Sequence, residues 1–113
     1  MTVRRGEIYN VDFSPARGSE QGGIRPALII QNDLGNQHSS TTIVAALTSR
    51  QKQRYPFHVE FTADESGMDR DGTALLEQLL TISRDRLSER RGELPAARMA
   101  EVDAALKRSL ALR

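Results

Sequence analysis

Arg25 stands directly before Pro26 and a short apolar run at 27–30. Pro26 restricts the backbone of Arg25 to extended conformations, so this guanidinium is held at the entrance of a predicted strand. A guanidinium fixed in this way can bind a phosphate through two hydrogen bonds and stabilise developing negative charge. It can equally form a simple ion pair with a carboxylate such as Glu20 or Asp12. The residue types alone leave both interpretations open.

The segment before Arg25, GSEQGG at positions 18–23, is small and polar. It lacks the GK[ST] ending of a phosphate-binding P-loop, and no GxSxG motif surrounds Ser19. Its backbone N–H groups can still line a phosphate or the edge of a base. The sequence therefore predicts a ligand-binding loop here and no serine nucleophile.

No metal or cofactor is expected. His38 and His58 are far apart and form no HxxxH spacing, and the chain contains no cysteine. The acidic residues within 64–71 lack the glycine and the final glutamate of a calcium loop. We expect both histidines to be exposed, with His58 on the outer face of its strand.

With 113 residues and a formal net charge of +1, the chain is predicted to form one domain over 1–113 and to bind any polyanion through a local patch. Two predicted loops concentrate basic residues: Arg50, Lys52 and Arg54 in one, and Arg84, Arg86, Arg90 and Arg91 in the other. Each could be no more than a solvated loop. Neither a membrane-spanning run nor a signal peptide is recognisable, so we expect a cytoplasmic protein without a membrane association.

Hydrophobic patterning predicts strands over 6–13, 26–31, 41–48, 57–61 and 73–82. Single helical turns are expected after a cap at Asn32 or Asp33 and after Ser83, and a charged turn region is expected over 63–72. One longer helix is predicted over 95–112. Its core-facing stripe is Met99, Val102, Leu106 and Leu110. These elements predict a mainly β fold, a small barrel or curled sheet, with a C-terminal helix.

A set of ordered motifs extends over essentially the whole chain. They are RGEIY at 5–9, SP at 14–15, GSEQ at 18–21, RPALIIQN at 25–32, IVAALT at 43–48, LEQ at 76–78, TI at 81–82, and Leu87. Together they resemble the MazF/PemK family of toxin endoribonucleases. The resemblance implies the small SH3-like β-barrel of the MazF/CcdB group, a homodimer, and inhibition by a MazE-like antitoxin.

The implied activity is metal-independent, sequence-specific cleavage of single-stranded RNA, chiefly messenger RNA. Arg25 and Thr48 match the catalytic pair of the family. The positions that match where the family holds its RNA are Ser19, Glu20, Gln21, Asn32 and Gln78. Arg50 is a further substrate-binding candidate from the basic loop, whose role in base preference stays open.

The implied reaction is attack of the ribose 2′-OH on the adjacent phosphorus. Its products carry a 2′,3′-cyclic phosphate (or 3′-phosphate) and a 5′-OH. Arg25 would stabilise charge on the phosphoryl oxygens, and Thr48 would hydrogen-bond a phosphoryl oxygen or the 2′-OH. Two alternatives are a CcdB-like, non-enzymatic poison of DNA gyrase and an RNA-binding barrel without catalysis. Analysis of the reaction products separates the three.

Overall fold

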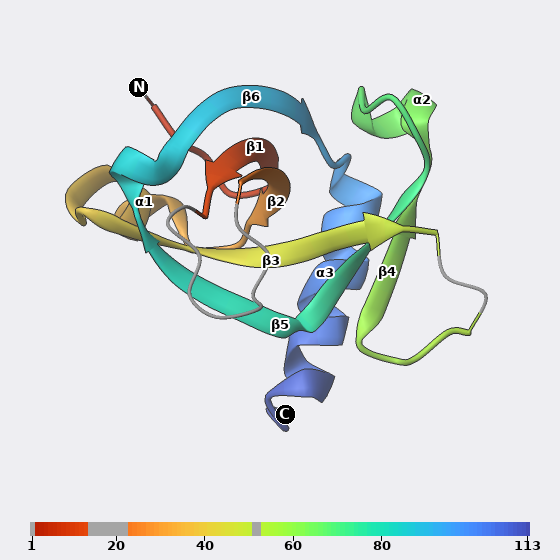
Figure 1. The fold of residues 1–113 in the computed structure, drawn as a ribbon. Helices are drawn as coiled ribbons and strands as arrows, with labels where there is room; N and C mark the ends of the chain where they lie inside the picture. The colour runs from red at the N-terminus through yellow and green to blue at the C-terminus, as the bar shows by residue number, and fades with distance from the viewer. Residues whose placement is uncertain (1, 14–22, 51–52) are drawn as a thin grey trace.

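The computed structural model describes residues 2–13, 23–50 and 53–113 (Figure 1). No helix in these ranges is long and apolar enough to cross a membrane. The elements follow in the order β1 Glu7–Asp12, β2 Ile24–Ile29, α1 Asp33–His38, β3 Thr41–Ser49, β4 His58–Phe61, α2 Ala63–Ser66, β5 Gly72–Ser83, the 3₁₀ turn η1 Arg84–Arg86, β6 Leu87–Glu93 and α3 Ala96–Ser109.

The strands form one antiparallel sheet in the order β4-β5-β3-β2-β1-β6. The sheet is strongly curved, and β5 and β6 arch around β1 and β2 (Figure 1). Within the described residues, no ladder joins the outer strands β4 and β6. The predicted mainly β architecture with a C-terminal helix is confirmed, as a curled sheet whose hydrogen bonds do not close the ring.

The two faces of the sheet bury separate apolar clusters because successive strand residues point to opposite faces. One cluster packs beneath α3, which contributes Val102 and Ala105, and includes Ile8, Leu28 and Ala45. The other cluster contains Val3, Tyr9, Val11, Ala27, Ile29, Val44, Ile82 and Leu87. β2 and β3 are therefore apolar on both faces, which is why the run at 27–30 shows no alternation.

Most of the predicted elements are present with shifted ends. All five predicted strands are found, and β2 begins two residues early, at Ile24, and ends at Ile29. Asn32 caps α1 and Ser83 caps η1, as expected from their side chains. The charged region after β4 contains a short helix, α2, which the capping box of Thr62 and Glu65 stabilises.

The prediction that Arg90 and Arg91 lie in a basic loop is wrong, because both residues belong to β6, Leu87–Glu93. The sequence LSERRGE carries no continuous apolar face, so its pattern gives no strand signal. Among the described residues β6 is an outer strand that pairs with β1, and its arginines form ion pairs with Glu7, Glu93 and Asp69. The hydrogen bond that Arg90 donates to Glu7 at 2.7 Å joins the two strands and raises the pKa of Arg90.

His58 lies on the opposite face of β4 from the core residues Val59 and Phe61, but the prediction that it is exposed is wrong, since its side chain is only 10% exposed. The rings of Tyr55 and Phe57 lie 5.2 and 4.9 Å from the imidazole, and Oε2 of Glu77 lies 3.1 Å from Nε2. The turn before β4 thus folds back over the outer face of the sheet, which a local alternation pattern cannot reveal. Leu110 also departs from its predicted stripe and is 53% exposed, because α3 ends at Ser109.

Candidate functional site

The ends of β2 and β3 bring Arg25 and Thr48 to opposing positions. The ladder between these strands pairs Ala27 with Ala46, and it ends there because Pro26 has no N–H to donate. Continuing the same antiparallel register by two residues places Arg25 opposite Thr48. Opposing residues of antiparallel strands share a face, with Cβ atoms about 5 Å apart. The fold therefore brings together two side chains that are 23 residues apart in the sequence.

The guanidinium of Arg25 is exposed on the outer surface of β2, where Val11 of β1 pairs with it. In the described part of the chain, Arg25 makes neither a hydrogen bond nor an ion pair, so the alternative pairing with Asp12 is not present. Its five N–H donors remain open to a ligand. A pairing with Glu20 concerns a residue that lies outside the described ranges.

Thr48 is half-buried and is held from the side opposite Arg25 by β5. Thr73 pairs with it directly across the ladder, and the neighbouring Gly72 allows a close approach of the strands. A Cβ at Gly72 would lie 2.6 Å from the ring of Phe61 and 3.1 Å from the carbonyl oxygen of Thr48. Close packing on this side fixes the backbone that carries the Thr48 hydroxyl.

Gln78 lies in an interruption of the β3–β5 register. Ala46 pairs with Leu75 while Ala45 pairs with Leu79, so residues 76–78 of β5 have no opposing residues on β3. The extra residues leave the side chain of Gln78 exposed, beside β3 and a few residues from Thr48. The register places Gln78 beside Ala45 and Ala46 in the middle of β3, and the end of the strand that carries Thr48 pairs with Thr73 instead.

Asn32 and Arg50 are placed differently from Gln78. Asn32 follows the far end of β2, roughly 20 Å from Arg25 at strand spacing, and its side chain accepts a hydrogen bond from the Gly35 N–H at 2.6 Å. Arg50 follows β3 directly and contacts Glu60 at 3.0 Å and Asp71 at 3.3 Å. The side-chain oxygen of Asn32 and the guanidinium of Arg50 are thus already engaged, unlike the guanidinium of Arg25 in the described part of the chain. The remaining predicted residues, Ser19, Glu20 and Gln21, lie outside the described ranges.

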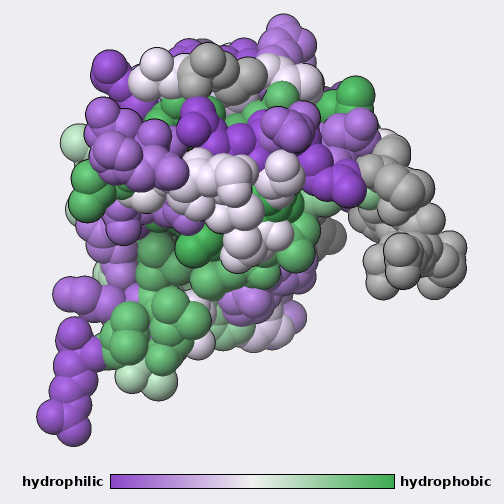
Figure 2. Space-filling model, turned by 90° about the vertical axis from the view of Figure 1, so that its left-hand side faces the viewer, coloured by the Kyte–Doolittle hydropathy of each residue, from purple (hydrophilic) through white to green (hydrophobic). Residues whose placement is uncertain are grey.

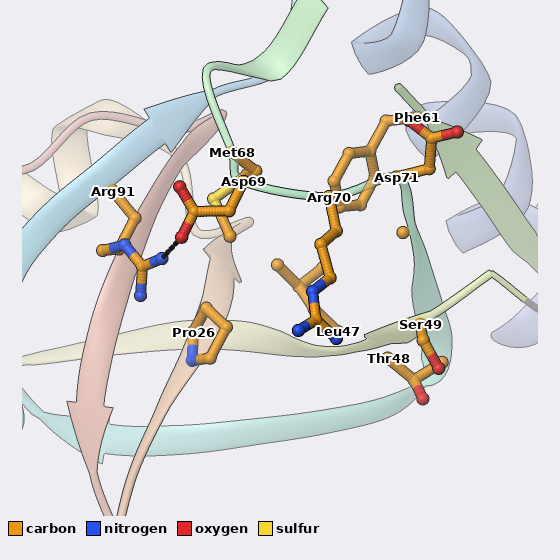
Figure 3. A pocket seen from close by; sticks show the side chains of 11 residues that line it. Pro26, Leu47, Thr48, Ser49, Phe61, Met68, Asp69, Arg70, Asp71 and Arg91 are labelled. Carbon is orange, nitrogen blue, oxygen red and sulfur yellow. Dashed lines mark hydrogen bonds and ion pairs between the residues drawn. The ribbon is translucent and has the colours of Figure 1, made fainter. Parts of the chain in front are cut away.

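A pocket of about 420 Å³ opens beside Thr48, between the ends of β2 and β3 and the segment before β5 (Figure 3). Its lining comprises Pro26, Leu47, Thr48, Ser49, Phe61, Met68, Asp69, Arg70, Asp71, Gly72 and Arg91. Sequence reasoning missed Arg70 and Arg91 as members of this region. The position of Arg70 directly before Asp71 and Gly72, where β5 starts, was the sequence feature that could have pointed to it. No comparable feature marks Arg91, which reaches the pocket through the pairing of β6 with β1.

The combination of groups suits a phosphodiester better than it suits a redox or metal-bound substrate. Arg25 supplies a cation without a hydrogen bond or ion pair in the described residues, Thr48 supplies a hydroxyl, and both lie at the ends of the central strands β2 and β3. Among residues 2–13, 23–50 and 53–113, no group of three or more His, Asp or Glu side chains is arranged to hold a metal ion. The arrangement can bind a phosphoryl group and stabilise charge on its oxygens.

Comparison with known proteins identifies relatives that cover nearly all of the chain. Residues 4–110 match the model of a family described as PemK-like, MazF-like toxins of type II toxin-antitoxin systems. Endoribonuclease EndoA of Bacillus subtilis (strain 168) is 51% identical over 113 residues, which cover 99% of this chain and 97% of that protein.

Solved structures agree with the sequence comparison. The crystal structure of MazF (Form-I) from Deinococcus radiodurans has a TM-score of 0.79 and 31% identity, covering 99% of each chain. A MazE-MazF crystal structure (Form-II) from the same organism has a TM-score of 0.81 and 31% identity, covering 100% of this chain and 99% of that one.

Proposed function

Because this chain belongs to the family of PemK-like, MazF-like toxins and is an endoribonuclease, we propose that it cleaves single-stranded messenger RNA at a short sequence motif without a metal ion. The observation that supports the proposal is the register of β2 and β3, which, continued by two residues, sets Arg25 opposite Thr48, together with the lack of a hydrogen bond or ion pair to Arg25 in the described residues. The curated relative supports the activity, because its name describes it as an endoribonuclease at 51% identity.

The proposed reaction is an in-line transesterification. The ribose 2′-oxygen attacks the adjacent phosphorus, the bond from phosphorus to the 5′-oxygen breaks, and the leaving oxygen takes a proton to become a 5′-OH. The other product ends in a 2′,3′-cyclic phosphate, which water can open to a 3′-phosphate. Arg25 stabilises the charge that gathers on the non-bridging oxygens, and Thr48 orients the phosphoryl group or the 2′-OH.

Arg25 acts as an electrostatic group in this scheme and not as the general base. A guanidinium with a pKa above about 12 is almost never deprotonated. The carboxylate of Glu20, which precedes β2 in the sequence, is our candidate for receiving the proton of the 2′-OH. Gln78 and Arg50 are proposed to contact the substrate, and Arg50 must exchange its ion pairs with Glu60 and Asp71 to do so.

The proposed partners are a MazE-like antitoxin and a second copy of this chain. The related Deinococcus structure is a MazE-MazF crystal structure, which supports the first. Figure 2 shows hydrophobic surface gathered on the lower part of the molecule, towards the end of α3. Large apolar side chains that are about half exposed or more in β5 and after α3 are Leu80, Leu110 and Leu112. Such a surface suits a protein interface.

Analysis of the cleavage products tests the proposal. Purified protein incubated with a long mixed-sequence RNA in EDTA is expected to give discrete cuts with 5′-OH ends, because no step requires a metal. Mapping the cuts also defines the recognised motif. Cutting that requires added metal would contradict the mechanism. If a folded protein cuts no RNA but inhibits gyrase, the non-enzymatic alternative, which family membership does not favour, would replace it.

The nucleophile gives a second prediction. An oligonucleotide with a single 2′-deoxy nucleotide on the 5′ side of the cut bond lacks the attacking hydroxyl and is expected to resist cleavage completely. The same substitution one nucleotide further away serves as the control and is expected to leave cleavage measurable. Gel analysis of both oligonucleotides compares them directly, and cutting at the deoxy position would refute 2′-OH attack.

A further inference from the structure

The pocket beside Thr48 lies on the opposite face of the sheet from the Arg25–Thr48 pair. Pro26 follows Arg25 and Leu47 precedes Thr48, so strand alternation directs Pro26 and Leu47 to the other face. Figure 3 shows Leu47 on one side of β3 and the side chain of Thr48 on the other. The pocket of about 420 Å³ therefore lies on the face of Pro26 and Leu47, and Thr48, which also lines it, connects the pocket with the proposed catalytic pair at the ends of β2 and β3.

Three of the charged side chains around this pocket are already paired. Asp69 binds Arg91 at 3.2 Å. Asp71 accepts a hydrogen bond from Arg50 at 3.3 Å and a second from the Ala63 N–H at 2.8 Å. Both carboxylates therefore have partners, and Asp71 keeps the hydrogen bond from the Ala63 N–H when Arg50 turns to the substrate.

Arg70 is the remaining charged residue of the pocket lining. It makes no hydrogen bond or ion pair in the part of the chain that the structure describes, and its side chain is exposed. Figure 3 shows the guanidinium lying over Leu47 and directed into the pocket. Pro26, Leu47 and Met68 give the pocket an apolar floor beside this cation. An unpaired guanidinium over apolar side chains is suited to a ligand with both a phosphate and a flat apolar group.

We propose that this pocket binds a nucleotide of the RNA that neighbours the cleaved bond, with Arg70 holding its phosphate and the apolar floor contacting its base. The inference rests on the proposed function, since it requires an RNA at Arg25. Each nucleotide of a single strand repeats a phosphate and a base. A strand bound at Arg25 and turning around the ends of β2 and β3 therefore presents both groups to the pocket.

Binding of a non-cleavable RNA, carrying the 2′-deoxy nucleotide at the cut site, measures this contact. Arg70→Ala is expected to weaken binding about tenfold or more, as loss of a charged hydrogen-bonding partner does. The slope of log K against log salt should fall by about 0.7, the value for one phosphate on a single strand. In cleavage assays KM should rise while kcat stays nearly unchanged. Lys107→Ala removes a positive charge of the same size from the last turn of α3, away from the pocket. This control variant should keep the wild-type affinity for the RNA, salt slope, KM and kcat.

Oligonucleotides lengthened one nucleotide at a time on either side of the cut locate the contact. Wild-type protein should gain affinity at one particular extension, and Arg70→Ala should lose that gain alone. Equal binding of every length by the variant and the wild type, with wild-type cleavage intact, would overturn this inference and leave the proposed function standing. Wild-type protein that neither binds nor cuts RNA would refute both. Weakened binding of the antitoxin alone would assign the pocket to a protein partner and overturn the nucleotide proposal.

Discussion

Replacement of Arg25 by alanine is expected to reduce RNA cleavage by at least about a hundredfold to a thousandfold, which is the usual cost of losing one group that stabilises transition-state charge. The guanidinium is exposed and unpaired in the described part of the chain, so its removal breaks no contact there. The folded protein should therefore unfold at the wild-type urea concentration. Single-turnover cleavage of a defined oligonucleotide measures the effect on chemistry.

Two further variants make this result specific. Arg25→Lys keeps the charge but loses the bidentate geometry, so we expect it to recover only part of the rate. Arg54→Ala removes an exposed arginine that pairs with Glu60 at 3.0 Å and should cleave at close to the wild-type rate. Cleavage by Arg25→Ala at the wild-type rate would show that another group stabilises the transition state.

The largest expected effect on stability comes from Gly92→Ala. Gly92 lies in β6, and a Cβ at this position would collide with the backbone carbonyl oxygen of Ser66 at the end of α2. That carbonyl cannot retreat easily, because the capping box of Thr62 and Glu65 holds α2 in place. Ordinary overpacking costs about 1–3 kcal/mol, and a clash with fixed backbone should exceed that range.

Urea unfolding compares Gly92→Ala with a neighbour on the same strand. Ser88→Ala alters an exposed side chain of β6 and is expected to change the free energy of unfolding by less than about 0.5 kcal/mol. If Gly92→Ala unfolds at the same urea concentration as the wild type, then β6 and α2 are not packed as closely as the structure has them.

A strand could be predicted from local sequence wherever its own residues form a clear apolar or β-branched run. The run at 27–30 and the β-branched segment at 41–48 are such cases, because they are buried on both faces and need no partner to be recognised. Local side-chain capping is equally readable, as Asn32 and Ser83 show. β6 could not be predicted, since an outer strand rich in charged residues is stabilised by β1 and by the ion pair of Arg90 with Glu7.

The candidate site also combines features that could be predicted from the sequence with features that depend on the fold. Sequence motifs singled out Arg25 and Thr48, and Pro26 explains by local sterics why Arg25 is extended. Only the fold supplies the β2–β3 register that, continued by two residues, sets Arg25 opposite Thr48. Only the fold shows that Gln78 is exposed at an interruption of the β3–β5 register and that the Asn32 side chain accepts a hydrogen bond at the far end of β2. Spacing along a chain does not fix the register between strands, which depends on burial of the two faces.

The sequence by itself determined the mainly β class, the capped turns, the C-terminal helix and the family resemblance, because each depends on neighbouring residues or ordered motifs. The tertiary structure decided the burial of His58, the strand that contains Arg90 and Arg91, and the pocket where, among the described residues, Arg70 has no ion pair while Asp69 and Asp71 do. Those features depend on contacts between residues that are far apart in the sequence. Ion pairs in particular form only after the sheet has curved and brought the ends of different strands together.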